Sequence, residues 1–105
     1  NVNGDGLDRD RAVICLISGE TQMEIPVGRV ERLIRRPEVI RVPGAPGEVE
    51  GILEFEGRLI TAYRMDDRGN MPPACAAVVR REGGTLAAVL AEEIAGGGRI
   101  DQIYG

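Results

Sequence analysis

Histidine, lysine and tryptophan are all absent from the 105 residues, and the thirteen basic side chains are all arginine. Histidine is the side chain that most readily exchanges protons near neutral pH, and it is the commonest zinc ligand. Without histidine or lysine, the few serine and threonine hydroxyls lack the bases that usually activate a nucleophile. The sequence therefore predicts a protein that is not an enzyme and that holds no cofactor or metal ion.

Positive charge is also in deficit, because seventeen acidic residues outnumber thirteen arginines and the net charge is −4. An acidic balance argues against a sequence-independent grip on nucleic acid and against docking on an anionic membrane surface. No apolar run approaches the roughly 20 residues of a membrane helix, and no signal peptide is visible, so we expect a cytoplasmic protein without membrane insertion. Cys15 and Cys75 lie in apolar runs and are interpreted as two reduced, buried thiols, although a disulfide between them stays open.

Length predicts one domain, since single domains centre on roughly 100–150 residues. Residues 1–11 are polar and contain glycine, which is typical of a flexible tail, so the folded β domain is expected to span residues 12–105. Only three residues are aromatic, so aliphatic side chains must form the core.

Short apolar segments separated by turn residues run through the chain and predict six to eight β-strands. A short helical turn is expected near Val27, running into a strand, and another at 91–95. Glu56-Gly57 is a hairpin signal in which Gly57 supplies a positive φ. The expected strands are 12–18, 21–27, 39–42, 52–55, 59–65, 74–80 and 85–90, with a further short strand at 99–105. No helix is long enough for a parallel α/β sheet, so the fold is predicted to be all-β, with the hairpins before and after the loop at 66–73 as two lobes.

Charged groups in the sequence admit two interpretations. The acidic pairs Asp66-Asp67 and Glu92-Glu93 lack a third ligand or an aromatic platform, so we interpret them as solvated surface. Four arginines between residues 29 and 36 form either a solvated face or a docking patch for an acidic partner. These are Arg29, Arg32, Arg35 and Arg36.

A motif at Pro46–Gly51 reads Pro-Gly-Glu-Val-Glu-Gly and precedes an apolar strand, the Glu56-Gly57 turn and a second apolar strand. Two later apolar strands flank Gly83-Gly84. In this order, from Ala12 to about Ile94, the chain resembles the CheW-like domains of bacterial chemotaxis coupling proteins. The resemblance implies two small SH3-like β-barrel lobes around a shared aliphatic core, with few short helical turns.

Several positions depart from the family pattern. The family's arginine in the hairpin turn falls at Glu56, and an upstream acidic position falls at Arg32, so two opposite charges have exchanged places. The aspartate that usually closes the next strand falls at Arg64, and the asparagine before the turn is Glu54. We predict that Arg32 and Glu56 still meet as a reversed ion pair, with their charged groups within about 6 Å, and that a surface pair of this kind influences partner choice more than stability.

The resemblance also implies a function, which we state as an expectation. It implies a non-enzymatic signalling adaptor that couples a methyl-accepting chemoreceptor tip to the regulatory domain of a CheA-type histidine kinase. The residues expected to bind partners are Val27, Val30 and Val49 as an apolar patch, Gly51 and Gly57 as turn formers, and Arg32 and Glu56 as specificity residues. A divergent β-barrel interaction module outside the chemotaxis pathway is the alternative, and Glu56 is the residue that favours it.

Overall fold

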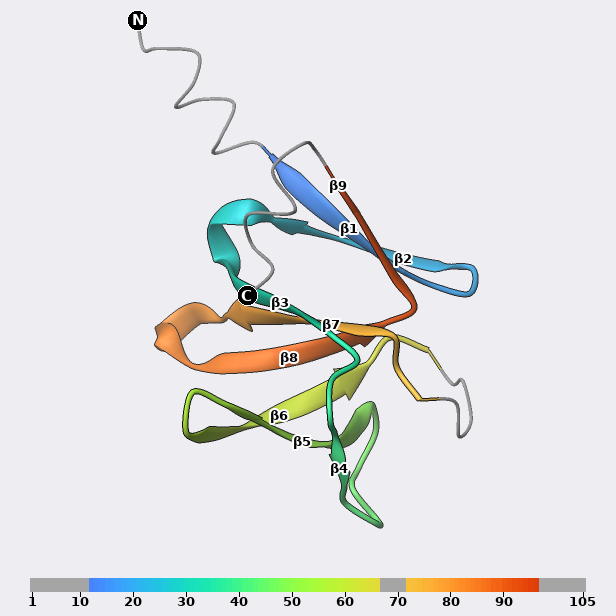
Figure 1. Ribbon diagram of the computed structural model, residues 1–105, viewed down its shortest axis with the longest axis vertical. Coiled ribbons are helices and arrows are strands. Elements are labelled where there is room, and N and C mark those ends of the chain that lie inside the picture. The colour runs from blue at the N-terminus through green and yellow to red at the C-terminus, as the bar shows by residue number, and fades with distance from the viewer. Residues whose placement is uncertain (1–11, 67–71, 97–105) are drawn as a thin grey trace, which may run out of the picture.

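The computed structural model describes residues 12–66 and 72–96, and within them the chain is built almost entirely of β-strands (Figure 1). The all-β prediction is confirmed. The predicted tail at 1–11 and the predicted strand at 99–105 lie outside the described residues. The elements are β1 (Val13–Ser18), β2 (Thr21–Pro26), the 3₁₀ turn η1 (Val27–Arg29), β3 (Val30–Arg35), β4 (Ile40–Arg41), β5 (Val49–Phe55), β6 (Arg58–Arg64), β7 (Cys75–Arg80), the 3₁₀ turn η2 (Glu82–Gly84), β8 (Leu86–Ala91) and β9 (Glu93–Gly96).

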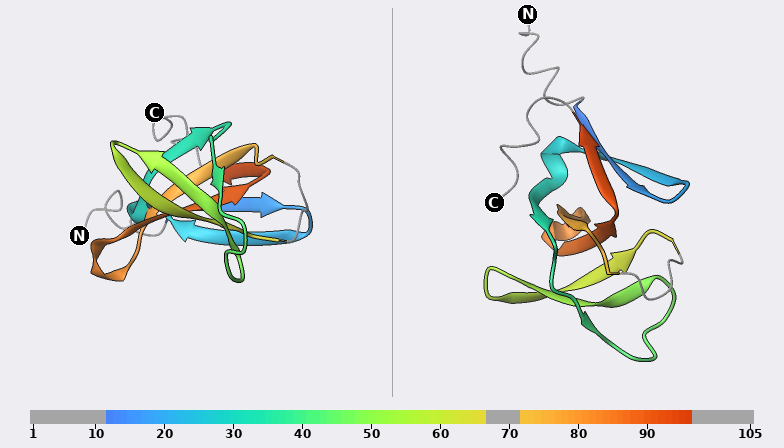
Figure 2. Two further views of the ribbon diagram at one scale, coloured as in Figure 1. Left: turned by 90° about the horizontal axis from the view of Figure 1, so that it is seen from below. Right: turned by 45° about the vertical axis from the view of Figure 1, so that its right-hand side comes forward.

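The described strands form two sheets, one of three strands in the order β2-β1-β9 and one of six in the order β3-β7-β8-β6-β5-β4. All described pairs are antiparallel except β6 with β8, which run parallel. The small sheet lies above the large one in Figure 1 and in the right-hand view of Figure 2. The predicted division of the lobes at the loop 66–73 is wrong, because β9 crosses back to pair with β1 and β3 joins β7.

Strands β7 and β8 lie at the centre of the molecule, with an apolar cluster on each side. On β7, Ala76 and Val78 belong to the first cluster with Leu53 and Phe55, whereas Ala77 and Cys75 belong to the second. Four consecutive buried residues on β7 therefore reflect a strand that is covered on both faces, which explains its unbroken apolar sequence. The aliphatic core is thus two clusters that share one strand pair.

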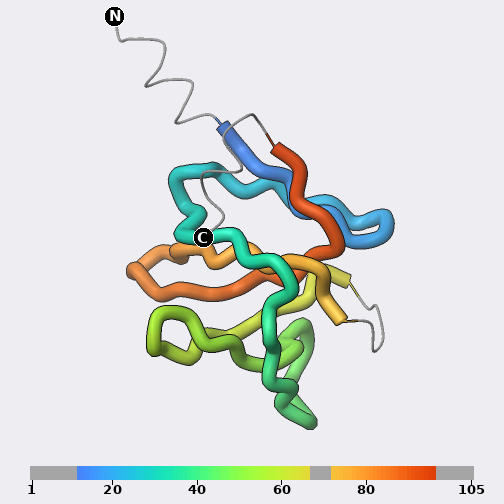
Figure 3. The backbone as a smooth tube through the Cα atoms, viewed as in Figure 1, coloured from blue at the N-terminus to red at the C-terminus, as the bar shows by residue number. Residues whose placement is uncertain are grey.

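Strand β9 replaces the helical turn that the sequence predicted at 91–95. The tube in Figure 3 shows it beside β1, and the register pairs Leu16 with Ile94 and Cys15 with Ala95. Ile94 packs against the second cluster in this position. The prediction was wrong because pairing with a distant strand supplies backbone hydrogen bonds and burial that outweigh local helix preference.

Two acidic residues hold the β1–β2 turn. The Oγ of Ser18, a buried residue, donates a hydrogen bond to Oδ1 of Asp66 at 3.1 Å, and the amide of Gly19 donates to Oε1 of Glu92 at 2.7 Å. Gly19 has a φ of +61°, a conformation that glycine adopts without strain. Asp66 and Glu92 are therefore not merely solvated surface groups, as the sequence suggested, because each accepts a hydrogen bond from the turn.

Candidate partner-binding site

The predicted reversed ion pair is present in the structure. Strand β3 carries Arg32 and the β5–β6 turn carries Glu56, and the Nη2 and Oε2 atoms lie 3.3 Å apart. The two side chains are 40% and 55% exposed. The geometric hypothesis for Arg32 and Glu56 is confirmed, and both charged groups remain within reach of a docking partner.

The hairpin turn explains why Glu56 projects at this place. Glu56 and Gly57 both adopt positive φ, at +53° and +79°. A two-residue turn with positive φ at both positions matches the right-handed twist of its strands, and Gly57 takes this conformation as the sequence predicted. Glu56 pays a small conformational cost for it, since left-handed backbone is uncommon for a residue with a Cβ atom.

Arg32 also covers the first apolar cluster. Its guanidinium carbon lies 5.4 Å from the ring centroid of Phe55, and Phe55 is buried. Strands β3 and β5 are not neighbours in the sheet order. The contacts from Arg32 to Phe55 and Glu56 therefore join two parts of the large sheet that no direct strand pairing links.

Gly51 occupies a position that admits no side chain. It is buried on β5, and a Cβ added there would lie 2.1 Å from the backbone oxygen of Ile40 on β4. Its predicted role as a turn former is replaced by one of close strand approach, because the register pairs Gly51 with Arg41 inside the sheet. The glycine therefore fixes how tightly β4 packs against β5.

Glu50, directly before Gly51, lies between two arginines. Its Oε2 lies 3.1 Å from Nε of Arg41 in an ion pair, and its Oε1 accepts a hydrogen bond from Nη1 of Arg64 at 3.1 Å. The β5–β6 register shifts between Val49 and Gly51, so Glu50 is the additional residue of a β-bulge. Sequence reasoning missed this arrangement, because the bulge that places Glu50 between the two arginines depends on the register of paired strands.

The three valines expected to form one apolar patch lie in two places. Val27 in η1 and Val30 in β3 are half-buried and pack against the second cluster. Val49 is half-buried at the start of β5, where it pairs with Tyr63 on β6. The structure brings Arg32, Glu56 and Gly57 together and places Val49 beside Gly51, whereas Val27 and Val30 pack against the second apolar cluster.

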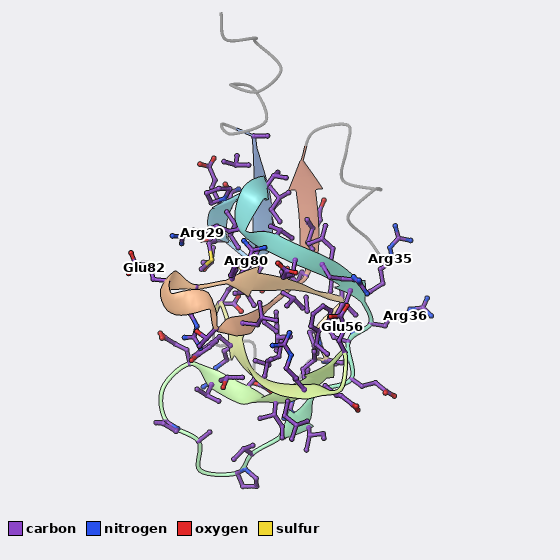
Figure 4. All side chains as sticks on the ribbon, turned by 90° about the vertical axis from the view of Figure 1, so that its left-hand side faces the viewer. Arg29, Arg35, Arg36, Glu56, Arg80 and Glu82 are labelled. Atoms are coloured by element: carbon purple, nitrogen blue, oxygen red, sulfur yellow. The ribbon has the colours of Figure 1, made fainter. Side chains whose placement is uncertain are left out.

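The arginines from 29 to 36 do not form a single patch. Figure 4 shows Arg29 near Arg80 at one side of the large sheet, and Arg35 and Arg36 at the other. Between them Arg32 is paired with Glu56. A partner that contacts one end of β3 therefore meets different arginines from a partner that contacts the other end.

Neither cysteine forms a disulfide. Burial, with a smaller contribution from the negative charge of Glu93, raises the pKa of Cys75 from 9.0 to about 11. Its Sγ donates to the backbone oxygen of Ala91 at 3.4 Å. Cys75 is thus a protonated thiol at neutral pH and a poor nucleophile. Cys15, predicted to be buried, is only partly so.

Across residues 12–66 and 72–96, no three histidine, cysteine or acidic residues are grouped so that they could hold a metal ion. In the same ranges, no helix has the length and apolar character to cross a membrane.

The fold and these contacts define a small two-sheet β domain with the Arg32–Glu56 ion pair at its surface. A family profile described as CheW-like domain matches residues 11–102. The chain therefore belongs to the CheW-like domain family.

A solved structure has the same fold. It is the scaffolding protein TtCheW from Thermoanaerobacter tengcongensis, with a TM-score of 0.68 at 15% sequence identity. The match covers 81% of this chain and 62% of that one, so the present chain spans less than two thirds of its structural neighbour. No curated protein matches the sequence. The CheW-like, all-β fold class predicted from the sequence is confirmed.

Proposed function

We propose that this protein is a non-enzymatic signalling adaptor of the CheW type. It couples the tip of a methyl-accepting chemoreceptor to the regulatory domain of a CheA-type histidine kinase in bacterial chemotaxis, and it acts in the cytoplasm. Membership of the CheW-like family supports the scaffold role. The proposed adaptor transforms no substrate and works by holding two other proteins in register.

The observation that carries the proposal is the ion pair between Arg32 and Glu56. The resemblance places an acidic and a basic group at these two positions, and this chain has both signs reversed while the side chains still meet at 3.3 Å. If the pair acted only on folding stability, its contribution would be small, since exposed ion pairs contribute about 0–1 kcal/mol to the free energy of unfolding. Its preserved contact with reversed signs is what we expect of a surface that selects among related partners, because juxtaposed like charges reject the wrong one.

Gly51 and Gly57 support this surface by shaping the backbone around it. Gly57 completes the turn that carries Glu56, and Gly51 permits the close approach of β4 to the strand that begins at Val49. Val27 and Val30 are proposed to contribute apolar area from the second cluster at a separate part of the interface.

Binding measurements with purified components test the proposal. The chain is titrated, by isothermal calorimetry, with regulatory domains of several CheA-type kinases and with receptor-tip fragments. We expect binding to at least one of each kind, and a weaker affinity for Glu56→Ala. Glu54→Ala is the matched control, because it removes the same charge from an exposed residue two positions away on the same hairpin.

The two candidate functions predict different outcomes. If no kinase domain and no receptor fragment binds the folded chain, the chemotaxis assignment is wrong and an interaction module outside that pathway takes its place. If both kinds bind but Glu56→Ala and Glu54→Ala behave alike, the adaptor role stands and the specificity role of Arg32 and Glu56 does not.

A further inference from the structure

Arg64 makes an unusual number of contacts to one short segment. Its Nη2 donates to the backbone oxygen of Gly47 at 2.8 Å, and its Nη1 to the backbone oxygen of Val49 at 3.2 Å and to Oε1 of Glu50 at 3.1 Å. Its own amide donates to the backbone oxygen of Glu48 at 2.9 Å. One residue at the end of β6 thus contacts all four residues from 47 to 50.

Two successive turns lead into β5, and Arg64 contacts the second of them. The amide of Ala45 donates to the oxygen of Val42, and the amide of Val49 to the oxygen of Pro46, both at 3.2 Å. Segments with few backbone hydrogen bonds open locally at low free energy, so contacts from outside such a loop contribute strongly to its order. The planar guanidinium of Arg64 donates three further hydrogen bonds, to Gly47, Val49 and Glu50, in a fixed fork geometry.

The bulge at Glu50 makes this arrangement possible. The extra residue turns the carboxylate of Glu50 to a position where its side chain is 15% exposed, between Arg64 on β6 and Arg41 on β4. Bulges of this kind re-aim a side chain and often lie beside binding sites. Glu50 therefore anchors Arg64, and Arg64 anchors the turn that leads into Val49.

We propose that Arg64 is a positioning residue for partner binding: through Gly47, Val49 and Glu50 it holds the turn 46–49 in the one conformation that presents Val49 to a partner. This inference rests on the proposed adaptor function. It gives Arg64, a position at which this chain departs from the family pattern, the role of ordering the docking surface before a partner binds. In the described fold this is the turn that follows β4 and opens β5 (Figure 1).

Preorganisation has a kinetic signature. When the competent conformation is only a fraction of the population, the apparent affinity falls by that fraction. Releasing the turn should therefore slow association by about five- to tenfold and leave the dissociation rate nearly unchanged, because the bound complex still contains the ordered turn. Loss of a direct contact with the partner would instead speed dissociation.

Three variants separate positioning from charge balance. Arg64→Met removes all side-chain donors, whereas Arg64→Lys keeps the charge opposite Glu50 but cannot reach the two backbone oxygens as a fork. Arg58→Met is the control, since Arg58 is an exposed arginine at the other end of the same strand. Association and dissociation rates are measured against the kinase regulatory domain that the wild-type chain binds.

Hydrogen exchange of the free chain supplies a readout that needs no partner. The amides of Val49 and Arg64 are bonded to Pro46 and Glu48, so their exchange should accelerate by about tenfold in both Arg64 variants if the turn loosens. The amide of Gly84, which donates to the backbone oxygen of Arg81 directly before η2, is the internal reference and should not change.

The outcomes distinguish this inference from the proposed function. Slower association and faster local exchange in Arg64→Met and Arg64→Lys, with Arg58→Met unchanged, support it. If Arg64→Lys exchanges its amides and associates at wild-type rates, the inference is wrong, because the positive charge alone is then enough to order the turn. If the wild-type chain binds no kinase or receptor fragment, the proposed function fails, and exchange at Val49 still decides whether Arg64 orders the turn.

Discussion

Exchanging the charges of Arg32 and Glu56 gives a sharp test of the candidate site. The perturbation consists of Arg32→Glu, Glu56→Arg and the double variant, which restores the charge signs of the family pattern. At 3.3 Å, two unit charges attract by about 1 kcal/mol in water, and exposure of both side chains reduces the net contribution to roughly 0.5 kcal/mol. Reversing one charge converts this attraction into a repulsion of similar size.

The contact with Phe55 makes the two single variants unequal. Arg32 lies over the Phe55 ring, which adds about 0.5 kcal/mol at an exposed site. We therefore expect Arg32→Glu to lower the free energy of unfolding by about 1.5 kcal/mol and Glu56→Arg by about 1 kcal/mol. The double variant should lose only about 0.5 kcal/mol, since it regains the ion pair and forfeits the ring contact.

Urea unfolding of the four proteins measures these differences, at low salt and again at about 1 M salt, where screening should shrink the coupling between the two sites. Binding to the kinase regulatory domain is measured in parallel. If the charge signs select the partner, the stable double variant should bind the wild-type chain's partner about tenfold more weakly.

Additivity would refute the reasoning. If the double variant is destabilised by the sum of the single effects, about 2.5 kcal/mol, then Arg32 and Glu56 do not interact in solution. If the double variant is stable and binds its partner as the wild type does, the pair is structural and the specificity role is wrong.

Three further predictions concern individual positions. Gly51→Ala should destabilise the fold by about 3 kcal/mol in thermal unfolding, because the new Cβ would meet the Ile40 carbonyl, whereas Gly28→Ala, with open space around it, should have a small effect. The free energy of unfolding should fall as pH rises from 9.0 to about 11, since the folded chain binds the Cys75 proton more tightly than the unfolded chain does; Cys75→Ala should remove that component of the slope. At pH 8 a thiol reagent should label half-buried Cys15 before Cys75, and equal rates would show that Cys75 is accessible.

Local patterns in the sequence predicted most strands and turns. The β5–β6 hairpin followed from Glu56-Gly57, and the turn into a strand at η1 and β3 from the change of spacing after Val27. These elements depend on contacts between neighbours in the chain, so their signals lie in short windows of sequence. The reversed pair was also accessible, because the family pattern supplied the expected charges at both positions.

Other parts of the site were hidden because they depend on distant residues. Nothing near Arg64 in the sequence indicates that it contacts Gly47 and Val49, and the bulge at Glu50 becomes visible only in the register of two paired strands. The separation of Val49 from the clustered Val27 and Val30 likewise depends on where the strands cross.

By itself the sequence determined that the chain forms short aliphatic strands, since alternation, glycine turns and β-branched residues act within a few positions. The tertiary structure alone decided which distant strands pair: β9 returns to β1, and β3 joins β7, with Arg35 opposite Cys75. The physical reason is that backbone donors and acceptors are alike along every strand, so pairing is chosen by which faces can be buried together, and that choice depends on the whole chain.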